Sequence, residues 1–125
     1  MSKTIALRTV LTERLRTCCP RVWYGQAKDT TQRPYLVYTV EQLSYGDGQH
    51  LMELEVNVVD YGDDTAPAEE LSDAVESAFD QWHYLDETIQ ISAYNDRKQP
   101  VEEEDRQVVR RRLLIELHVY ERRND

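Results

Sequence analysis

The sequence predicts an α+β domain in which two helices pack on one face of a mainly antiparallel sheet of four to five strands. From Leu51 to Val59, apolar and polar residues alternate, which is typical of a half-buried strand. From Leu71 to Trp82, apolar residues recur at spacings of three and four, which is typical of one helical face, so this helix should cover a sheet. A length of 125 residues corresponds to a single domain spanning residues 1–125.

The first half of the chain predicts a helix followed by two strands. Ser2 or Thr4 can cap a helix whose apolar residues share one face, and Pro20 prevents its continuation. Arg21 to Tyr24 is a short β-forming segment, and the polar stretch from Gln26 to Arg33 is expected to be a mobile loop. Pro34 to Val40 is rich in β-formers and predicts the next strand.

The second half predicts a hairpin, a helix and a second hairpin. The turn from Tyr45 to Gln49 contains two glycines and joins the preceding strand to the Leu51 strand. Asp64 or Thr65 can cap the second helix, with Pro67 in its first turn. Ile89 to Ala93 alternates as a fourth strand, Asn95 to Asp105 is expected to be a polar, acidic connection, and Val109 to Val119 forms the last strand with Arg111 as an exception on its apolar face.

The charge of the chain argues against nucleic-acid binding through a basic face. The formal net charge is −9, with 24 acidic and 15 basic residues. Arginines cluster from Arg106 to Arg112, but the acidic run from Glu102 to Asp105 precedes them directly and opposes their field. That acidic run is expected to be a solvated hairpin tip, or a surface that docks a basic partner. No apolar run approaches the length of a membrane span, so we expect no membrane contact.

No catalytic, cofactor or metal motif is recognisable, and we expect neither enzymatic activity nor a cofactor. Cys18 and Cys19 are adjacent, which indicates reduced thiols, and a helix end disfavours Cys18 as a nucleophile. The three histidines, His50, His83 and His118, lack the close spacing of metal ligands. The cluster of Asp60, Asp63 and Asp64 lacks the EF-hand pattern and fits a turn followed by a helix cap.

Four segments resemble the small tail-terminator, or tail-completion, proteins of tailed bacteriophages and prophages. They are the amphipathic helix from Leu7 to Leu15, the strand from Pro34 to Tyr38, the strand from Leu51 to Asp60 that leads into the helix at 68–75, and the closing strand from Val108 to Tyr120. The resemblance covers nearly the whole chain. It implies a structural protein of the virion neck or tail, present in the bacterial host cytoplasm during assembly.

The resemblance also implies partners. Such proteins form a homo-oligomeric ring, usually hexameric, that caps the tail tube protein, ends tube growth and meets the head connector protein. Six copies would carry six times −9, or −54 charges, so DNA should pass through an electronegative lumen without specific binding. We expect the Asn95 to Asp105 connection or the Tyr45 to Gln49 turn to face the lumen or a partner; the residues singled out are Asp47, Glu102, Glu103, Glu104 and Asp105.

Two alternatives stay open. One is another neck or head-completion ring protein, which would bind the portal rather than the tube. The other is a small cytoplasmic enzyme or ligand-binding domain with a cleft near four aromatic residues, Trp23, Tyr24, Tyr35 and Tyr38.

Overall fold

The computed structural model describes residues 2–28 and 32–122, which form two helices and a six-stranded sheet. The elements, in chain order, are α1 (Lys3–Arg16), β1 (Val22–Tyr24), β2 (Tyr35–Gly46), β3 (Gln49–Tyr61), α2 (Ala66–Phe79), β4 (His83–Leu85), β5 (Ile89–Val101) and β6 (Val108–Glu121). The strand order is β1-β2-β3-β6-β5-β4. All neighbours are antiparallel except β1 and β2, which run parallel.

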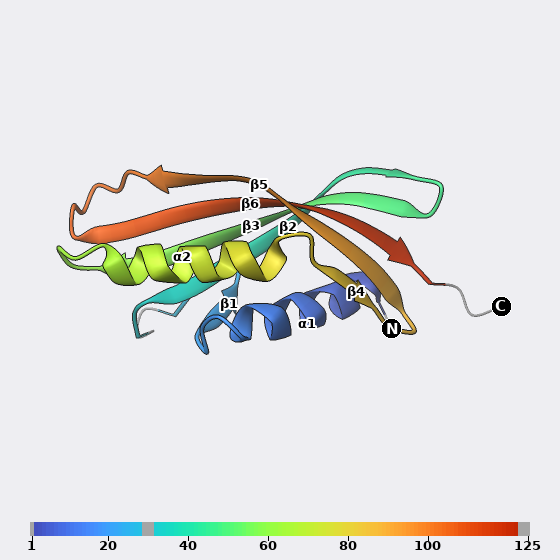
Figure 1. The fold of residues 1–125 in the computed structure, drawn as a ribbon, viewed down its shortest axis with the longest axis horizontal. Helices are drawn as coiled ribbons and strands as arrows, with labels where there is room; N and C mark the ends of the chain where they lie inside the picture. The colour runs from blue at the N-terminus through green and yellow to red at the C-terminus, as the bar shows by residue number, and fades with distance from the viewer. Residues whose placement is uncertain (1, 29–31, 123–125) are drawn as a thin grey trace.

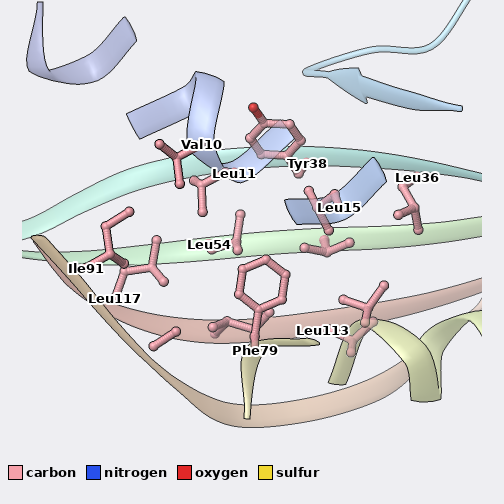
Figure 2. Packing of buried hydrophobic residues seen from close by; sticks show 14 of the residues in the cluster. Val10, Leu11, Leu15, Leu36, Tyr38, Leu54, Phe79, Ile91, Leu113 and Leu117 are labelled. Carbon is pink, nitrogen blue, oxygen red and sulfur yellow. The ribbon is translucent and has the colours of Figure 1, made fainter. Parts of the chain in front are cut away.

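Both helices lie on the same side of the sheet, as predicted (Figure 1). Every second residue of the long strands faces the helices, and these side chains form one core with the buried faces of α1 and α2. Figure 2 shows side chains of the helices and of several strands pointing into this shared layer, with Phe79 among them. Phe79, Leu7, Leu11, Leu15, Leu54 and Ile115 have no exposed surface.

The helix caps follow the sequence closely. The Ser2 hydroxyl accepts a long hydrogen bond of 3.5 Å from the backbone N–H of Ile5 at the start of α1. At the start of α2, the Asp64 carboxylate accepts a hydrogen bond from the backbone N–H of Ala66 at 2.9 Å, whereas the Thr65 side chain makes no cap bond. Of the two predicted caps, Asp64 is therefore the residue whose side chain binds a backbone N–H at the start of α2.

The predicted number of strands was wrong, because β4 was missed and the residues just before it were assigned to the second helix. That helix ends at Phe79 rather than at Trp82. Gln81 adopts a positive φ of 50°, and the chain turns into the three-residue strand β4. Trp82 still packs on Phe79, with ring centroids 5.4 Å apart, so it kept the spacing of a helical face without being helical.

The predicted connection from Asn95 to Asp105 was also too long. β5 continues to Val101 and pairs with β6 as far as Arg110, so only residues 102–107 connect the two strands. A register shift between Asn95 and Arg97 reverses which residues face the helices, and this β-bulge hid the alternation. β2 likewise runs beyond Val40 to Gly46, with a register shift between Gln42 and Ser44. Residues 29–31 of the expected loop lie outside the described residues.

Within the described residues, neither helix is long and apolar enough to cross a membrane.

Candidate interaction surfaces

The two predicted loops lie at opposite ends of the sheet (Figure 1). The β2–β3 turn, which contains Asp47, lies beside the last residues of β6, because Gln49 pairs with Tyr120. The connection that contains Glu102 to Asp105 leads into the first residue of β6. A strand of 14 residues spans roughly 46 Å, so the structure does not bring the two loops together.

The turn at Asp47 is exposed and tightly wound. Asp47 has a φ of 54° and Gly48 a φ of 77°, a left-handed pair that suits Asp and Gly. Just before the turn, Leu43 is 50% exposed and Tyr45 is 60% exposed. This apolar exposure was not predicted, although Tyr45 is the first residue of the predicted turn and Leu43 lies two residues before it.

The acidic connection is partly tied to the sheet. Glu103 binds the guanidinium of Arg110 with an N–O distance of 2.8 Å and is half-buried. Asp105 accepts hydrogen bonds from the backbone N–H groups of Gln107 and Val108 and so forms the turn. Glu102 and Glu104 are exposed, so these two carboxylates are the free charges of the run.

The face of the sheet opposite the helices, here called the open face, carries a polar network. The Arg110 guanidinium donates to the Asn57 side-chain oxygen at 3.0 Å, and the Asn57 amide donates to Glu55 at 3.0 Å. Glu55 lies 3.5 Å from Nε of Arg112, an ion pair without hydrogen-bond geometry. The network joins β3 to β6, with Glu103 at its end.

The open face also carries a row of carboxylates. Glu41 of β2 lies directly opposite Glu53 of β3, which lies opposite Glu116 of β6. Like charges at such positions repel one another. His118 Nε2 lies 3.1 Å from Glu116, and no Lys or Arg of the described residues forms a salt bridge with the row. The alternation along β3 predicted that Glu53 faces solvent, but the row depends on strand register, which the sequence did not reveal.

The four aromatic residues of the ligand-binding alternative do not share one cleft. Tyr38 faces the helices, is 1% exposed, and meets Tyr24 edge-to-face at 5.1 Å. Trp23 and Tyr35 alternate with these residues along β1 and β2 and so point to the open face. There Tyr35 helps to line a shallow hollow of about 340 Å³ with Arg33 and Arg110.

The cysteines and histidines are also separated. Cys18 and Cys19 are free thiols, and burial raises the pKa of Cys18, which disfavours the thiolate. His50 contacts Gln42, His83 contacts Ser92, and His118 contacts Glu116. In residues 2–28 and 32–122, no group of three or more His, Cys, Asp or Glu side chains is arranged to hold a metal ion.

One surface was not anticipated, the outer side of α1. There a groove of about 400 Å³ is lined by Ile5, Arg8, Thr9, Thr12, Glu13 and Arg16. Ile5 is 56% exposed, and the Arg8 guanidinium stacks on the Tyr24 ring at 3.7 Å. The helix carries Lys3, Arg8, Arg14 and Arg16 against Glu13, a net +3 in a chain of net −9. The contrast between a basic helix and an acidic chain could be read from the sequence. The groove could not, because it depends on how the helix packs on the sheet.

Comparison with known proteins gives a likeness of fold. No protein-family model and no curated protein matches the chain. A chain of the structure described as "Virion of native gene transfer agent (GTA) particle" matches with a TM-score of 0.65 and 16% sequence identity, covering 85% of this chain and 84% of that chain. The protein therefore shares its α+β fold, along most of both chains, with a component of that virion.

Proposed function

We propose that this chain is a structural protein of a phage-like particle, and that it forms a ring that caps the tail tube, ends tube growth and joins the tail to the head connector. The observation that supports the proposal is the fold likeness to a chain of a gene transfer agent virion over 85% of the sequence. The order of elements that resembles tail-terminator proteins points in the same direction.

The surfaces of the protein are consistent with a role in assembly. The polar network and the carboxylate row lie on the open face, and the two predicted loops lie at the two ends of the sheet. Surfaces of this extent suit contacts with large partners. The exposed carboxylates of Glu102 and Glu104 are the feature we assign to the lumen or to the tail tube. In that position they would repel the phosphates of passing DNA.

The first test is the absolute mass of the purified protein by light scattering across a concentration series. Six copies of 14.8 kDa give a ring of about 89 kDa, and negative-stain images of that fraction should show closed rings. The same measurement is repeated with purified tail tubes added, so that rings which form only on a template are also detected. Monomers in both samples would contradict the proposal.

The second test separates termination from a neck role. Deleting the gene from the genome that encodes the particle should give full heads and abnormally long tails. Tails of normal length with leaking heads would instead place the ring at the portal.

A charge reversal of both Glu102 and Glu104 to Lys should leave ring formation intact and slow DNA passage, because the lumen would then bind phosphates.

A further inference from the structure

One edge of the sheet is left open over most of its length. β1 pairs only with Leu36, Val37 and Tyr38 of β2, so the outer edge of β2 from Thr39 to Gly46 has no strand partner among the described residues. Exposed edges of this kind favour association with another chain. We call the hairpin from Glu41 to Leu51 the arm.

Along the first strand and turn of the arm, two exposed apolar residues lie between two acidic residues. Leu43 is 50% exposed and has no partner in the register with β3, and Tyr45 is 60% exposed. Glu41 and Asp47 are the acidic residues of the arm, which contains no Lys or Arg. An apolar, acidic arm is expected to dock on a surface that is apolar and basic.

The groove on the outer side of α1 has the complementary chemistry. Ile5 offers exposed apolar surface, and Arg8 and Arg16 form no salt bridge with any described residue. The lengths also match, because Ile5 to Arg16 extends about 16 Å along a helix. Glu41 to Asp47 extends at most about 20 Å along a strand.

A chain does not place its arm in its own groove. The Tyr45 ring packs on His50 of the same arm at 4.4 Å, and His50 contacts Lys3 at the beginning of α1. The arm is thereby held beside the first residues of α1, as part of the sheet. The groove lies on the other side of α1, away from the buried residues that contact the sheet.

We propose that the arm of one copy docks into the α1 groove of a second copy, with Glu41 facing Arg16 at one end of the groove and with Leu43 and Tyr45 lying toward Ile5 and Arg8 at the other end. The arm and the groove are different surfaces, so the contact is head-to-tail, and each copy has one of each to offer. Such contacts close into rings when the rotation between copies allows it. This inference rests on the ring formation in the proposed function and names the contact that builds the ring.

Charge reversal tests the contact. Glu41→Lys and Arg16→Glu should each weaken self-association at least tenfold by light scattering, and the double variant should recover most of the loss. Glu87→Lys is the matched control, because it makes the same charge change at an exposed residue between β4 and β5. Glu41→Lys should also leave the monomer at least as stable as the wild type, because it removes one negative charge from the carboxylate row. Urea unfolding of each variant checks that weaker association does not come from misfolding.

Cross-linking tests the geometry. In a Cys18→Ala, Cys19→Ala background, Ser44→Cys and Thr9→Cys variants are mixed and oxidised with copper phenanthroline. The mixture should give a covalent dimer, each variant alone should not, and one chain carrying both cysteines should give a ladder. Circular dichroism of each variant checks that the chain is folded.

The outcomes separate this inference from the proposed function. Rings that form normally with Glu41→Lys and Arg16→Glu would overturn the arm contact and leave the ring proposal intact. Dimers formed by Ser44→Cys alone would also overturn it, because they indicate a symmetric arm-to-arm contact. A wild-type protein that stays monomeric, free and on tail tubes, would overturn both.

Discussion

Along β3, Leu54 and Val56 face the helices with no exposed surface, whereas Glu53 and Glu55 of the same strand face outward and remain half-exposed. The covered face is held by close apolar packing, and the open face by ion pairs and side-chain hydrogen bonds. Because a strand alternates its side chains, one set of residues can stabilise the fold while the next set stays available to partners. Substitutions on the two faces should therefore differ in their effect on stability.

The largest difference is expected for the apolar residues. Phe79→Ala should lower the free energy of unfolding by about 3 to 5 kcal/mol, because it leaves a cavity between the helices and the sheet. Leu114 is the nearly buried leucine of the open face, 4% exposed, and Leu114→Ala should cost about 2 kcal/mol, near the low end for such changes. Urea unfolding measures both, and an equal or larger loss for Leu114→Ala would contradict the division between the faces.

The next contrast uses two tyrosines of β2. The hydroxyl of Tyr38 donates to the backbone oxygen of Arg8 at 3.0 Å and lies 2.6 Å from the Thr12 hydroxyl. Tyr38→Phe removes the hydroxyl that makes both contacts with α1 and should cost about 1 to 1.5 kcal/mol. Tyr35, on the open face, makes no side-chain hydrogen bond with a described residue, so Tyr35→Phe should be neutral in the same unfolding assay.

A smaller effect of opposite sign is expected in the carboxylate row. Glu53→Gln removes the middle charge between Glu41 and Glu116 and should stabilise the protein by about 0.2 to 1 kcal/mol at low salt. The gain should shrink as salt is added, because screening already weakens the repulsion. Glu87→Gln serves as the control for loss of one negative charge elsewhere. A destabilised Glu53→Gln protein would show that the row is not a repulsive contact.

The smallest effect on stability is expected for Lys98, which lies on the covered face beyond the last buried apolar residues of β5. Its ammonium donates to Asp73 of α2 at 2.9 Å, and this hydrogen bond raises the pKa of Lys98 above its ordinary value of 10.5. The folded protein thus holds this proton more tightly than the unfolded chain. The contribution is complete below pH 10.5 and is lost as pH rises through the folded pKa.

Because the pair is partly exposed, Lys98 should contribute only ~0.3 kcal/mol. The measurement is the difference in unfolding free energy between the wild type and Lys98→Met, followed from pH 9 to pH 12. The difference should fall toward zero at the alkaline end. A difference that stays constant across this range would argue that Lys98 acts through its aliphatic stem and not through its charge.

The sequence predicted those parts of the fold in which one periodicity continues without interruption. The apolar stripes of α1 and α2 and the alternation of β3 and β6 are confirmed by burial. Arg111, the exception in β6, faces the helices near the end of the sheet and pairs with Glu69 in the first turn of α2. It is a charged residue with a partner, so it interrupts the apolar pattern without disturbing the strand.

The parts of the fold that could not be predicted depend on strand register or involve elements too short to show a periodicity. The bulges in β2 and β5 each change the alternation in mid-strand, and β4 has only three residues. The parallel pairing of β1 with β2 could not be predicted either, because it depends on a tertiary contact. In that contact the backbone N–H of Leu36 donates to the backbone oxygen of Arg21 at 2.9 Å. Turn chemistry and charge singled out Asp47 and the acidic run as candidate contact residues, and their role stays a prediction. The α1 groove could not be predicted in this way, because it depends on which side of a helix remains uncovered.

The central position of β6 has a consequence for synthesis on the ribosome. β6 follows the other strands in the sequence but lies between β3 and β5, and its partners on β3 are about 50 to 70 residues away in the chain, as with Tyr61 and Val108 or Gln49 and Tyr120. The β2–β3 hairpin can form early in translation, yet β3 keeps one side unpaired until β6 has emerged from the exit tunnel. A nascent chain stalled before β6 should therefore present a bare strand to chaperones, and a stalled-ribosome series could time the closure of the sheet.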